Sequence, residues 1–323
     1  MANIDFTYFY KQKYSNIYEI KCLDYDILIS TFNTTERVCK VFEAISANEK
    51  YLIVLPEHMN LFNSSVMPLD AQQIHLPSYS DYISLIQFLE TLQLDENKKL
   101  CIDITGFIIP HILFTIKYLQ KRKHIRKLEL LYTEPQKYIN EENTNFTDYF
   151  HNVVQIIGYG GSPNPNSEND LLIIASGYDD SRITDVADKK RRVNNKIQLF
   201  GFPSMQADMF QENILKAYKA EVSSEWYKNL DNNLFAPAND PFVAAQTIKE
   251  YIDKEKHNNK NFSNIYLAPI STKPHALGMA LYYLWENSKE DQPISIIYPV
   301  CDKYFGDTTE GISKIWKYDV ELP

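Results

Sequence analysis

Two stretches decide the fold: residues 26–38, DILISTFNTTERV, and residues 170–183, DLLIIASGYDDSRI. Each begins with a short apolar run, passes through polar residues, and then reaches an arginine followed by an apolar residue. An apolar run bounded by polar residues is typical of a buried strand that leads into a helix. The two stretches therefore predict two strand–loop–helix units of the same kind.

Outward from these stretches, apolar runs alternate with helical patterns. Buried strands are predicted at 26–30, 51–55, 100–104, 128–132, 170–175, 196–200, 265–268 and 294–298, and helices at 36–45, 82–92, 110–120, 207–220, 241–254 and 274–286. Strands of about five residues alternating with longer helices indicate a parallel sheet covered on both faces. The predicted fold class is α/β.

The two halves of the chain also match at further points. IPHILFTIKYL (109–119) matches KPHALGMALYYL (273–284), and ELLYTEPQKY (129–138) matches SIIYPVCDKY (295–304). Matches in the same order predict an internal duplication into two Rossmann-like parallel-sheet halves. We expect a first half over 1–157, a Gly- and Pro-rich linker or long loop over 158–169, and a second half over 170–323.

Composition excludes several familiar classes. The 323 residues include only 9 glycines, and neither the G-x-G-x-x-G nor the P-loop pattern occurs. The net charge of −9 disfavours general affinity for nucleic acid. Scattered cysteines suggest reduced thiols, and there is no apolar run of about 18 residues. We expect a cytoplasmic protein that does not enter a membrane.

Candidate ligand-binding residues follow the predicted strands, because open parallel sheets bind ligands beyond the carboxyl ends of their strands. In the first half these are Thr31, Asn33, Thr35, Arg37, Asp103 and Thr105. In the second half they are Ser176, Tyr178, Asp179, Asp180, Arg182, Ser271, Thr272 and Lys273.

The sharpest local signal is Ser271-Thr272-Lys273-Pro274. Hydroxyl groups and free backbone N–H groups at a helix start favour an anion, and Lys273 adds positive charge. One interpretation is a phosphate or carboxylate site. The other is an ordinary Ser/Thr helix cap followed by proline.

The loop 178–182 places a carboxylate pair beside an arginine. Asp179 and Asp180 are candidates to bind a divalent ion or a ribose, or to divide acid and base roles, with His275 as a third catalytic candidate. Helix capping explains the same residues. The seven histidines form no metal-binding spacing, so no metal site is predicted. No cofactor is certain; Mg²⁺ accompanying a nucleotide stays open.

One basic run contrasts with the acidic background. Lys189, Lys190, Arg191 and Arg192 follow one another directly. Such a run offers contacts to a phosphate backbone or to an acidic protein partner.

At STKPHALG (271–278) the sequence resembles the CARF-like Rossmann domains of prokaryotic defence systems, which sense cyclic nucleotides. The matching residues are Ser271 to Pro274, and 176–182 corresponds to the early-strand loop. The usual Gly-Gly before Thr-Lys is replaced here by Pro269-Ile270-Ser271. The resemblance implies a nucleotide-sensor-like fold with a regulatory or anti-phage role.

Three functions follow from these observations. The leading one is binding of a nucleotide or another phosphorylated small ligand at the strand ends. The second is hydrolysis of a phosphoester or nucleoside through Asp179 or Asp180. The third is a non-catalytic partner subunit of a defence complex.

Overall fold

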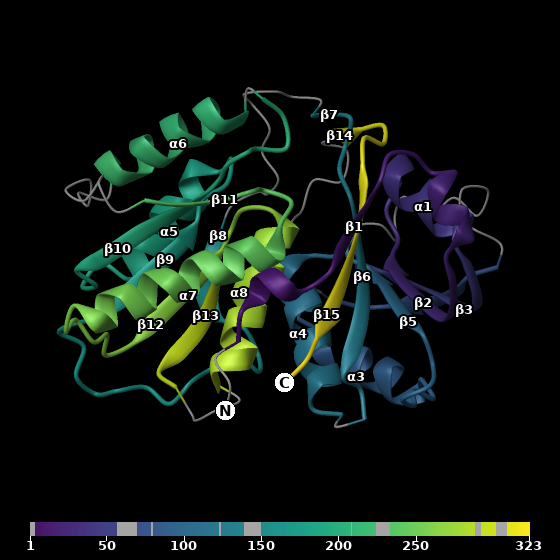
Figure 1. Ribbon diagram of the computed structural model, residues 1–323, viewed down its shortest axis with the longest axis horizontal. Helices are drawn as coiled ribbons and strands as arrows, with labels where there is room; N and C mark the ends of the chain where they lie inside the picture. The colour runs from purple at the N-terminus through teal and green to yellow at the C-terminus, as the bar shows by residue number, and fades with distance from the viewer. Residues whose placement is uncertain are drawn as a thin grey trace.

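The computed structural model describes residues 4–56, 70–78, 80–122, 124–138, 150–207, 209–223, 233–287, 292–301 and 309–323. Over these ranges the chain is an α/β protein with seven α-helices and mixed sheets of mostly parallel strands (Figure 1). None of the described helices is long and apolar enough to cross a membrane. The predicted α/β class is confirmed.

The first sheet has seven strands in the order β1-β15-β6-β5-β2-β3-β4. Strands β2 to β6 run parallel, and β15 lies antiparallel between β1 and β6. The strands are β1 (Lys11–Tyr14), β2 (Asp24–Thr31), β3 (Ser46–Val54), β4 (Gln72–His75), β5 (Leu100–Asp103), β6 (Lys127–Thr133) and β15 (Ile315–Glu321). The helices between them are η1 (Phe6–Tyr8), η2 (Glu19–Cys22), α1 (Glu36–Ala44), α3 (Tyr82–Thr91) and α4 (Ile109–Gln120).

The second sheet has six strands in the order β11-β10-β9-β12-β13-β8. All neighbours are parallel except β8, which is antiparallel to β13. The strands are β8 (Phe150–Gln155), β9 (Leu171–Ala175), β10 (Asn195–Gly201), β11 (Leu234–Ala236), β12 (Ile265–Pro269) and β13 (Ile294–Cys301). The helices are α5 (Asp180–Lys189), α6 (Met209–Ser223), α7 (Pro241–His257) and α8 (Lys273–Asn287), and a small ladder joins β7 (Lys137–Tyr138) to β14 (Thr309–Glu310).

Every strand and helix predicted from the sequence overlaps an observed element. The missed strands are β1, β4, β7, β8, β11, β14 and β15, several of them short. β15 alternates buried and partly exposed residues, unlike the wholly buried β9. Continuous apolar runs reveal strands covered on both faces, whereas mixed strands at a sheet margin give a weaker signal.

The two sheets share a strand order. Five strands lie as β4-β3-β2-β5-β6 in one and β11-β10-β9-β12-β13 in the other, which is the same pattern in chain order. The antiparallel strand beside each set comes from the other half of the chain. Residues 150–155 form β8 in the second sheet, and 315–321 form β15 in the first sheet. Sheet membership therefore crosses the boundaries predicted at 157 and 170.

In each sheet the direction in which strands are added reverses between two neighbouring strands, β2 and β5 in the first sheet and β9 and β12 in the second. A loop that contains a glycine follows one strand of each pair. Gly106 follows β5, and a Cβ there would lie 2.3 Å from the carbonyl oxygen of Thr31 at the end of β2. Gly177 follows β9, and a Cβ there would lie 2.5 Å from the carbonyl oxygen of Ile270, beyond β12. Only glycine permits such an approach, so both loops can cross at the strand ends. Ligands bind at such reversal points in open α/β sheets.

The two halves pack through α4 and α8, which lie between the sheets (Figure 1). Buried apolar residues from both sheets form one continuous core. The predicted linker 158–169 is an irregular segment packed against this junction. Tyr159 is fully buried and donates its hydroxyl to the carbonyl of Leu113 in α4 at 2.8 Å. The backbone N–H of Asn164 is held by Asn264 at 2.8 Å.

Candidate functional site

The carboxyl ends of both parallel strand sets border a cavity of about 220 Å³. The predicted residues on its walls are Asn33, Arg37 and Thr105 from the first half, and Tyr178, Asp179, Arg182, Ser271, Thr272 and Lys273 from the second. The cavity thus brings together candidates that lie far apart in the sequence. Five helices begin at this cavity, namely α1, α4, α5, α6 and α8. The positive ends of their helix dipoles make the local field favourable for an anion.

Lys273 is the first residue of α8, and its side chain reaches across to the other half. Its Nζ donates to the carbonyl of Thr105 at 2.5 Å. Loss of hydration lowers the pKa of Lys273 to about 7; the positive charge of Arg37 also lowers it, and Asp103 opposes the shift. The lysine is therefore poised between charged and neutral forms near pH 7, and an anion beside it would favour the charged form.

Asp103 lies beneath this lysine and is fully buried at the end of β5. Its carboxylate accepts from the backbone N–H of Thr105 at 3.0 Å, from the Thr105 hydroxyl at 2.5 Å and from the Ser30 hydroxyl at 3.2 Å. Burial raises the pKa of Asp103, while these hydrogen bonds and Lys273 oppose the rise. Asp103 is not on the cavity wall, so it acts on the site through Thr105 and Lys273.

Each half also contributes one arginine from the first turn of a helix. Arg37 in α1 donates from Nη1 to the carbonyl of Thr133 at 3.0 Å, and its buried Nε makes no hydrogen bond with the described residues. The Arg182 guanidinium in α5 lies over the ring of Tyr298, 4.7 Å from its centroid. Both arginines line the cavity. Guanidinium groups are well suited to binding phosphate or carboxylate.

The capping interpretation of the Ser-Thr-Lys-Pro segment accounts for Thr272. Its Oγ1 accepts from the backbone N–H of His275 at 3.3 Å and donates to the carbonyl of Ala238 at 2.6 Å. Capping does not account for Lys273, whose ammonium points to the opposite wall. The segment is therefore both a helix start and the source of a cation in the cavity.

The carboxylate pair separates in the structure. Asp179 caps α5, accepting from the Ser181 hydroxyl at 2.6 Å and from the Arg182 backbone N–H at 3.4 Å. The Asp180 carboxylate instead pairs with Lys219 of α6 at 2.6 Å, and Asp180 is not on the cavity wall. No metal-binding group of three His, Cys, Asp or Glu side chains occurs within the described ranges. The two carboxylates thus have different partners and only Asp179 faces the cavity.

The matching loop of the first half is held by Asn33. Its Oδ1 accepts from the backbone N–H of Thr35 at 3.0 Å and from the Thr35 hydroxyl at 2.5 Å. Thr35 is buried as the residue that precedes α1, and Thr31 is buried with its carbonyl against Gly106. Asn33 therefore faces the cavity, while Thr31 and Thr35 shape the loop from behind.

Two further candidates lie away from the cavity. Ser176 is buried and donates its hydroxyl to Gln198. His275 is fully buried, with Nε2 3.1 Å from the carbonyl oxygen of Pro237, and burial lowers its pKa to about 4. Neither residue is on the cavity wall. At neutral pH His275 is uncharged and positions the loop after β11.

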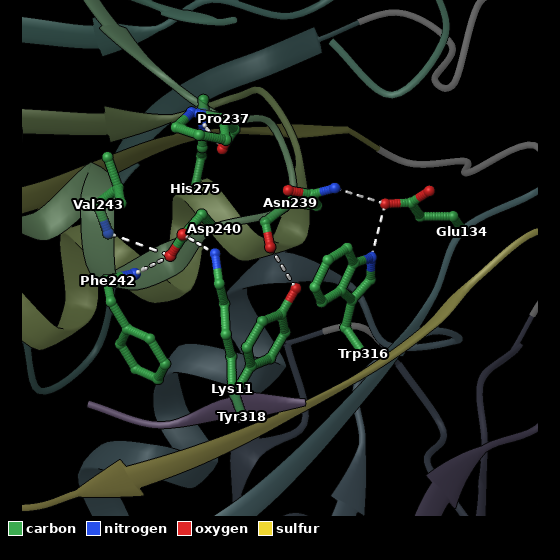
Figure 2. A network of polar contacts seen from close by, with 10 residues as sticks. All are labelled: Lys11, Glu134, Pro237, Asn239, Asp240, Phe242, Val243, His275, Trp316 and Tyr318. Atoms are coloured by element: carbon green, nitrogen blue, oxygen red, sulfur yellow. Dashed lines mark hydrogen bonds and ion pairs between the residues drawn. The ribbon is translucent and has the colours of Figure 1, made fainter. Parts of the chain in front are cut away.

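That loop, residues 237–240, connects the cavity to the first sheet (Figure 2). Asp240 caps α7 through the backbone N–H groups of Phe242 at 3.1 Å and Val243 at 3.2 Å, and pairs with Lys11 of β1. Asn239 accepts the Tyr318 hydroxyl at its backbone carbonyl, 2.6 Å away, and its side chain donates to Glu134 at 2.8 Å.

Glu134 completes this connection between the halves. Its Oε1 also accepts from Trp316 Nε1 at 2.7 Å, and the side chain is almost fully buried. The loop 237–240 is thus fixed to strands β1 and β15 on one side and to the start of α8 on the other. The backbone carbonyl of Ala238 in this loop accepts from the Thr272 hydroxyl, so the loop positions Thr272.

The basic run lies at the far end of α5 from the cavity. The helix has 10 residues, so its ends are about 15 Å apart. Lys189 donates to the side chain of Asn152 at 3.1 Å, and the Lys190 ammonium lies 3.3 Å from the centroid of the Tyr266 ring. Arg191 and Arg192 are exposed. This surface is separate from the cavity.

The sequence did not single out several residues of the cavity wall. These include Tyr132, Tyr138, Met205, Asn213 and Tyr298. Asn213 donates to the carbonyl of Ser176 at 2.9 Å, and its buried Oδ1 has no hydrogen-bond partner among the described residues. The tyrosines lie in the strands β6, β7 and β13, where an aromatic residue predicts core packing. The matching segments ELLY (129–132) and SIIY (295–298) could have pointed to Tyr132 and Tyr298 as wall residues.

Comparison with protein-family models and with curated proteins finds no match for this chain.

Proposed function

We propose that this protein binds a nucleotide or another phosphorylated small ligand in the cavity between its two halves. The observation that carries the proposal is the convergence of three basic side chains, Arg37, Arg182 and Lys273, on walls whose described residues include one carboxylate, Asp179. Among the described wall residues the two arginines outnumber the single carboxylate, and Lys273 adds further positive charge in its protonated form, in an otherwise acidic chain. That excess selects a ligand with negative charge.

The local geometry favours phosphate within the class of anions. Five helix starts provide a favourable field, and the two arginines approach from opposite halves. The buried Nε of Arg37 lacks a hydrogen-bond acceptor among the described residues. An oxyanion at that position would satisfy it and would favour the protonated form of Lys273.

The cavity volume limits the size of the ligand. At about 220 Å³ it lies below the roughly 300–1,000 Å³ typical of sites for drug-sized molecules. A ligand of mononucleotide size is favoured over an extended polymer. Mg²⁺ would enter with the phosphates of such a ligand, and Asp179 is the carboxylate that the described wall offers it.

We infer that the two halves arose by internal duplication of a Rossmann-like unit. The matching strand orders support this inference. Each unit on its own provides only part of the cavity wall. A duplicated chain therefore supplies in one molecule what two separate copies would supply in a dimer.

The resemblance of 271–278 to CARF-like domains extends the proposal to biological role. A ligand held between two halves favours one relative arrangement of them, which is how a sensor responds to its signal. We propose a regulatory function, in anti-phage defence, for a protein located in the cytoplasm. The exposed Arg191 and Arg192 would then be available to a protein or nucleic-acid partner.

Hydrolysis and a purely structural role make different predictions. Asp180 pairs with Lys219 and His275 is buried, so Asp179 alone would have to supply acid–base chemistry at the cavity. Turnover of a bound nucleotide that Asp179→Asn abolishes would support the hydrolase. Co-purification with another protein, without any response to ligand, would support the partner subunit.

A thermal-shift screen of the full chain tests the proposal. The compounds are mono-, di- and cyclic nucleotides, ribose 5-phosphate and inorganic phosphate, each with and without Mg²⁺. A ligand that binds the folded state raises the melting temperature, by an amount that grows with ligand concentration. We expect such a shift in the wild-type protein and its loss in Lys273→Ala. If no compound shifts the melting temperature, the proposal is wrong.

A further inference from the structure

Tyr138 and Tyr178 face one another from opposite halves of the cavity. Their rings are nearly parallel, at 15°, and their centroids are 6.5 Å apart. Both residues line the cavity and both are half-buried. Tyr138 lies in the short strand β7, and Tyr178 lies in the loop between β9 and α5. Each half therefore contributes one ring to the pair.

We propose that a planar nucleobase stacks between Tyr138 and Tyr178. This inference rests on the proposed function, because it assigns the base of the same ligand whose phosphate the cations would bind. It narrows the ligand from any phosphorylated small molecule to a nucleotide. The two tyrosines bind the base, and Arg37, Arg182 and Lys273 bind the phosphate.

The loose pairing of two nearly parallel rings favours this assignment. Stacked bases in a duplex are about 3.4 Å apart, so a base between two parallel rings needs roughly 6.8 Å. The two centroids are 6.5 Å apart, a distance that includes any sideways offset of the rings and lies near the upper limit for directly interacting aromatic pairs, so the two rings are loosely paired. A small rotation of either half-buried side chain would admit a base.

The charges around the pair place the phosphate nearby. The positive charge of Arg37 acts on the Tyr138 hydroxyl, lowering a pKa that burial raises. The Lys216 ammonium lies 5.7 Å from the centroid of the Tyr178 ring. Cations thus lie close to both rings. A nucleotide offers a planar ring and an anionic group in one molecule, whereas a sugar phosphate offers only the second.

Stacking on tyrosine tolerates every base, because each base has an aromatic face. The pair therefore predicts discrimination between nucleotides and phosphosugars, and does not by itself discriminate among bases. The contribution of one aromatic stacking partner corresponds to a change in affinity of about 5- to 150-fold.

Calorimetric titration of the full chain tests the assignment. The probes are AMP, GMP, CMP and UMP, with ribose 5-phosphate and inorganic phosphate as ligands without a base. The variants are Tyr178→Leu and Tyr138→Leu, which remove a ring, and Tyr178→Phe, which keeps it. Tyr18→Leu is the matched control, since Tyr18 is 74% exposed and carries a lysine 5.1 Å from its ring centroid.

We expect at least one nucleotide to bind about tenfold or more tightly than ribose 5-phosphate. Either Leu variant should remove most of that advantage and leave the affinity for ribose 5-phosphate unchanged. Tyr178→Phe and Tyr18→Leu should bind like the wild type. Unchanged melting temperatures in the Leu variants show that the loss is not a loss of folding.

Two results overturn the stacking assignment while the proposed function stands. One is ribose 5-phosphate binding as tightly as every nucleotide. The other is a Leu variant that binds nucleotide with wild-type affinity. If no nucleotide, sugar phosphate or phosphate binds, both proposals fail, so the two failures are distinguishable.

Discussion

The two walls of the cavity have the same framework and different chemistry. Each supplies an arginine from the first turn of the helix after its central strand, Arg37 and Arg182, and a tyrosine from a matching strand, Tyr132 and Tyr298. The walls differ at the residue before Pro-His, which is Ile109 in the first half and Lys273 in the second. The two sheets have the same strand order, but only the second half has a lysine at the matching position before Pro-His.

The side chain of Lys273 crosses the cavity to the first half, which explains why this difference matters. Its ammonium contacts the Thr105 carbonyl of the first wall, beside Arg37 and above Asp103. The second half thus supplies the charge, and the first half supplies its surroundings. The comparison predicts one anion subsite shared by both walls instead of two equivalent subsites.

Replacing Lys273 by the residue of the other wall has the largest expected effect. Lys273→Ile removes a charged donor from the anion subsite, and such hydrogen bonds contribute about 1.5–3 kcal/mol. We expect nucleotide affinity to fall by about 100-fold, measured by calorimetry, with no loss of melting temperature, because burying a lysine is costly.

The reverse exchange shows whether the walls are equivalent. Ile109→Lys in the Lys273→Ile background places the ammonium on the first wall, at a position that is 6% exposed. We expect no recovery of affinity and a lower melting temperature. Recovery to wild-type affinity would mean that either wall can form the subsite, contrary to the asymmetry argued here.

Arg37 and Arg182 test the feature that both walls share, a guanidinium group facing the cavity. Arg37→Gln and Arg182→Gln each remove one guanidinium and keep a polar side chain. We expect each to weaken nucleotide binding by about 10- to 30-fold, as for one charge-assisted hydrogen bond. Calorimetry at two salt concentrations checks the charge effect, and Arg192→Gln serves as an exposed control. A loss confined to one of the two arginines would contradict a shared phosphate site.

Removing the contact that Glu134 makes between the halves has the next largest expected effect, a loss of folding stability. Glu134→Ala leaves the Asn239 amide and the Trp316 indole N–H without their acceptor. We expect the free energy of unfolding to fall by about 2 kcal/mol in chemical denaturation. Glu134→Gln keeps an acceptor oxygen and should lose less. Equal losses in the two variants would show that the charge of Glu134, and not the acceptor, holds loop 237–240.

The smallest expected effect concerns the paired histidines. Burial lowers the pKa of both His111 and His275 to about 4, below the ordinary value of 6.5. Between pH 6.5 and 4 the unfolded chain therefore binds more protons at these sites, so their contribution to stability is lost as the pH falls through this window. His111→Gln and His275→Gln should each flatten the pH dependence of chemical denaturation. An unchanged slope would show that the imidazoles titrate normally.

The sequence predicted the α/β class and the order of the central elements because those strands are continuous apolar runs. It did not predict that β8 and β15 lie in the sheet of the opposite half, since pairing between distant strands leaves no local pattern. Lys273, Arg37 and Arg182 were found because charged residues directly after apolar strands are conspicuous. Tyr138 and Tyr298 were missed because a tyrosine in a strand has the same appearance whether it faces core or cavity.

Hydrogen–deuterium exchange of the full chain, with and without the nucleotide that gives the largest thermal shift, tests the central claim most directly. The claim is that one ligand contacts both walls of the cavity. We predict slower exchange in peptides covering 105–109 and 271–276 together, with little change around the basic run at 189–192. Protection of only one wall, or of neither while the melting temperature rises, would contradict the claim.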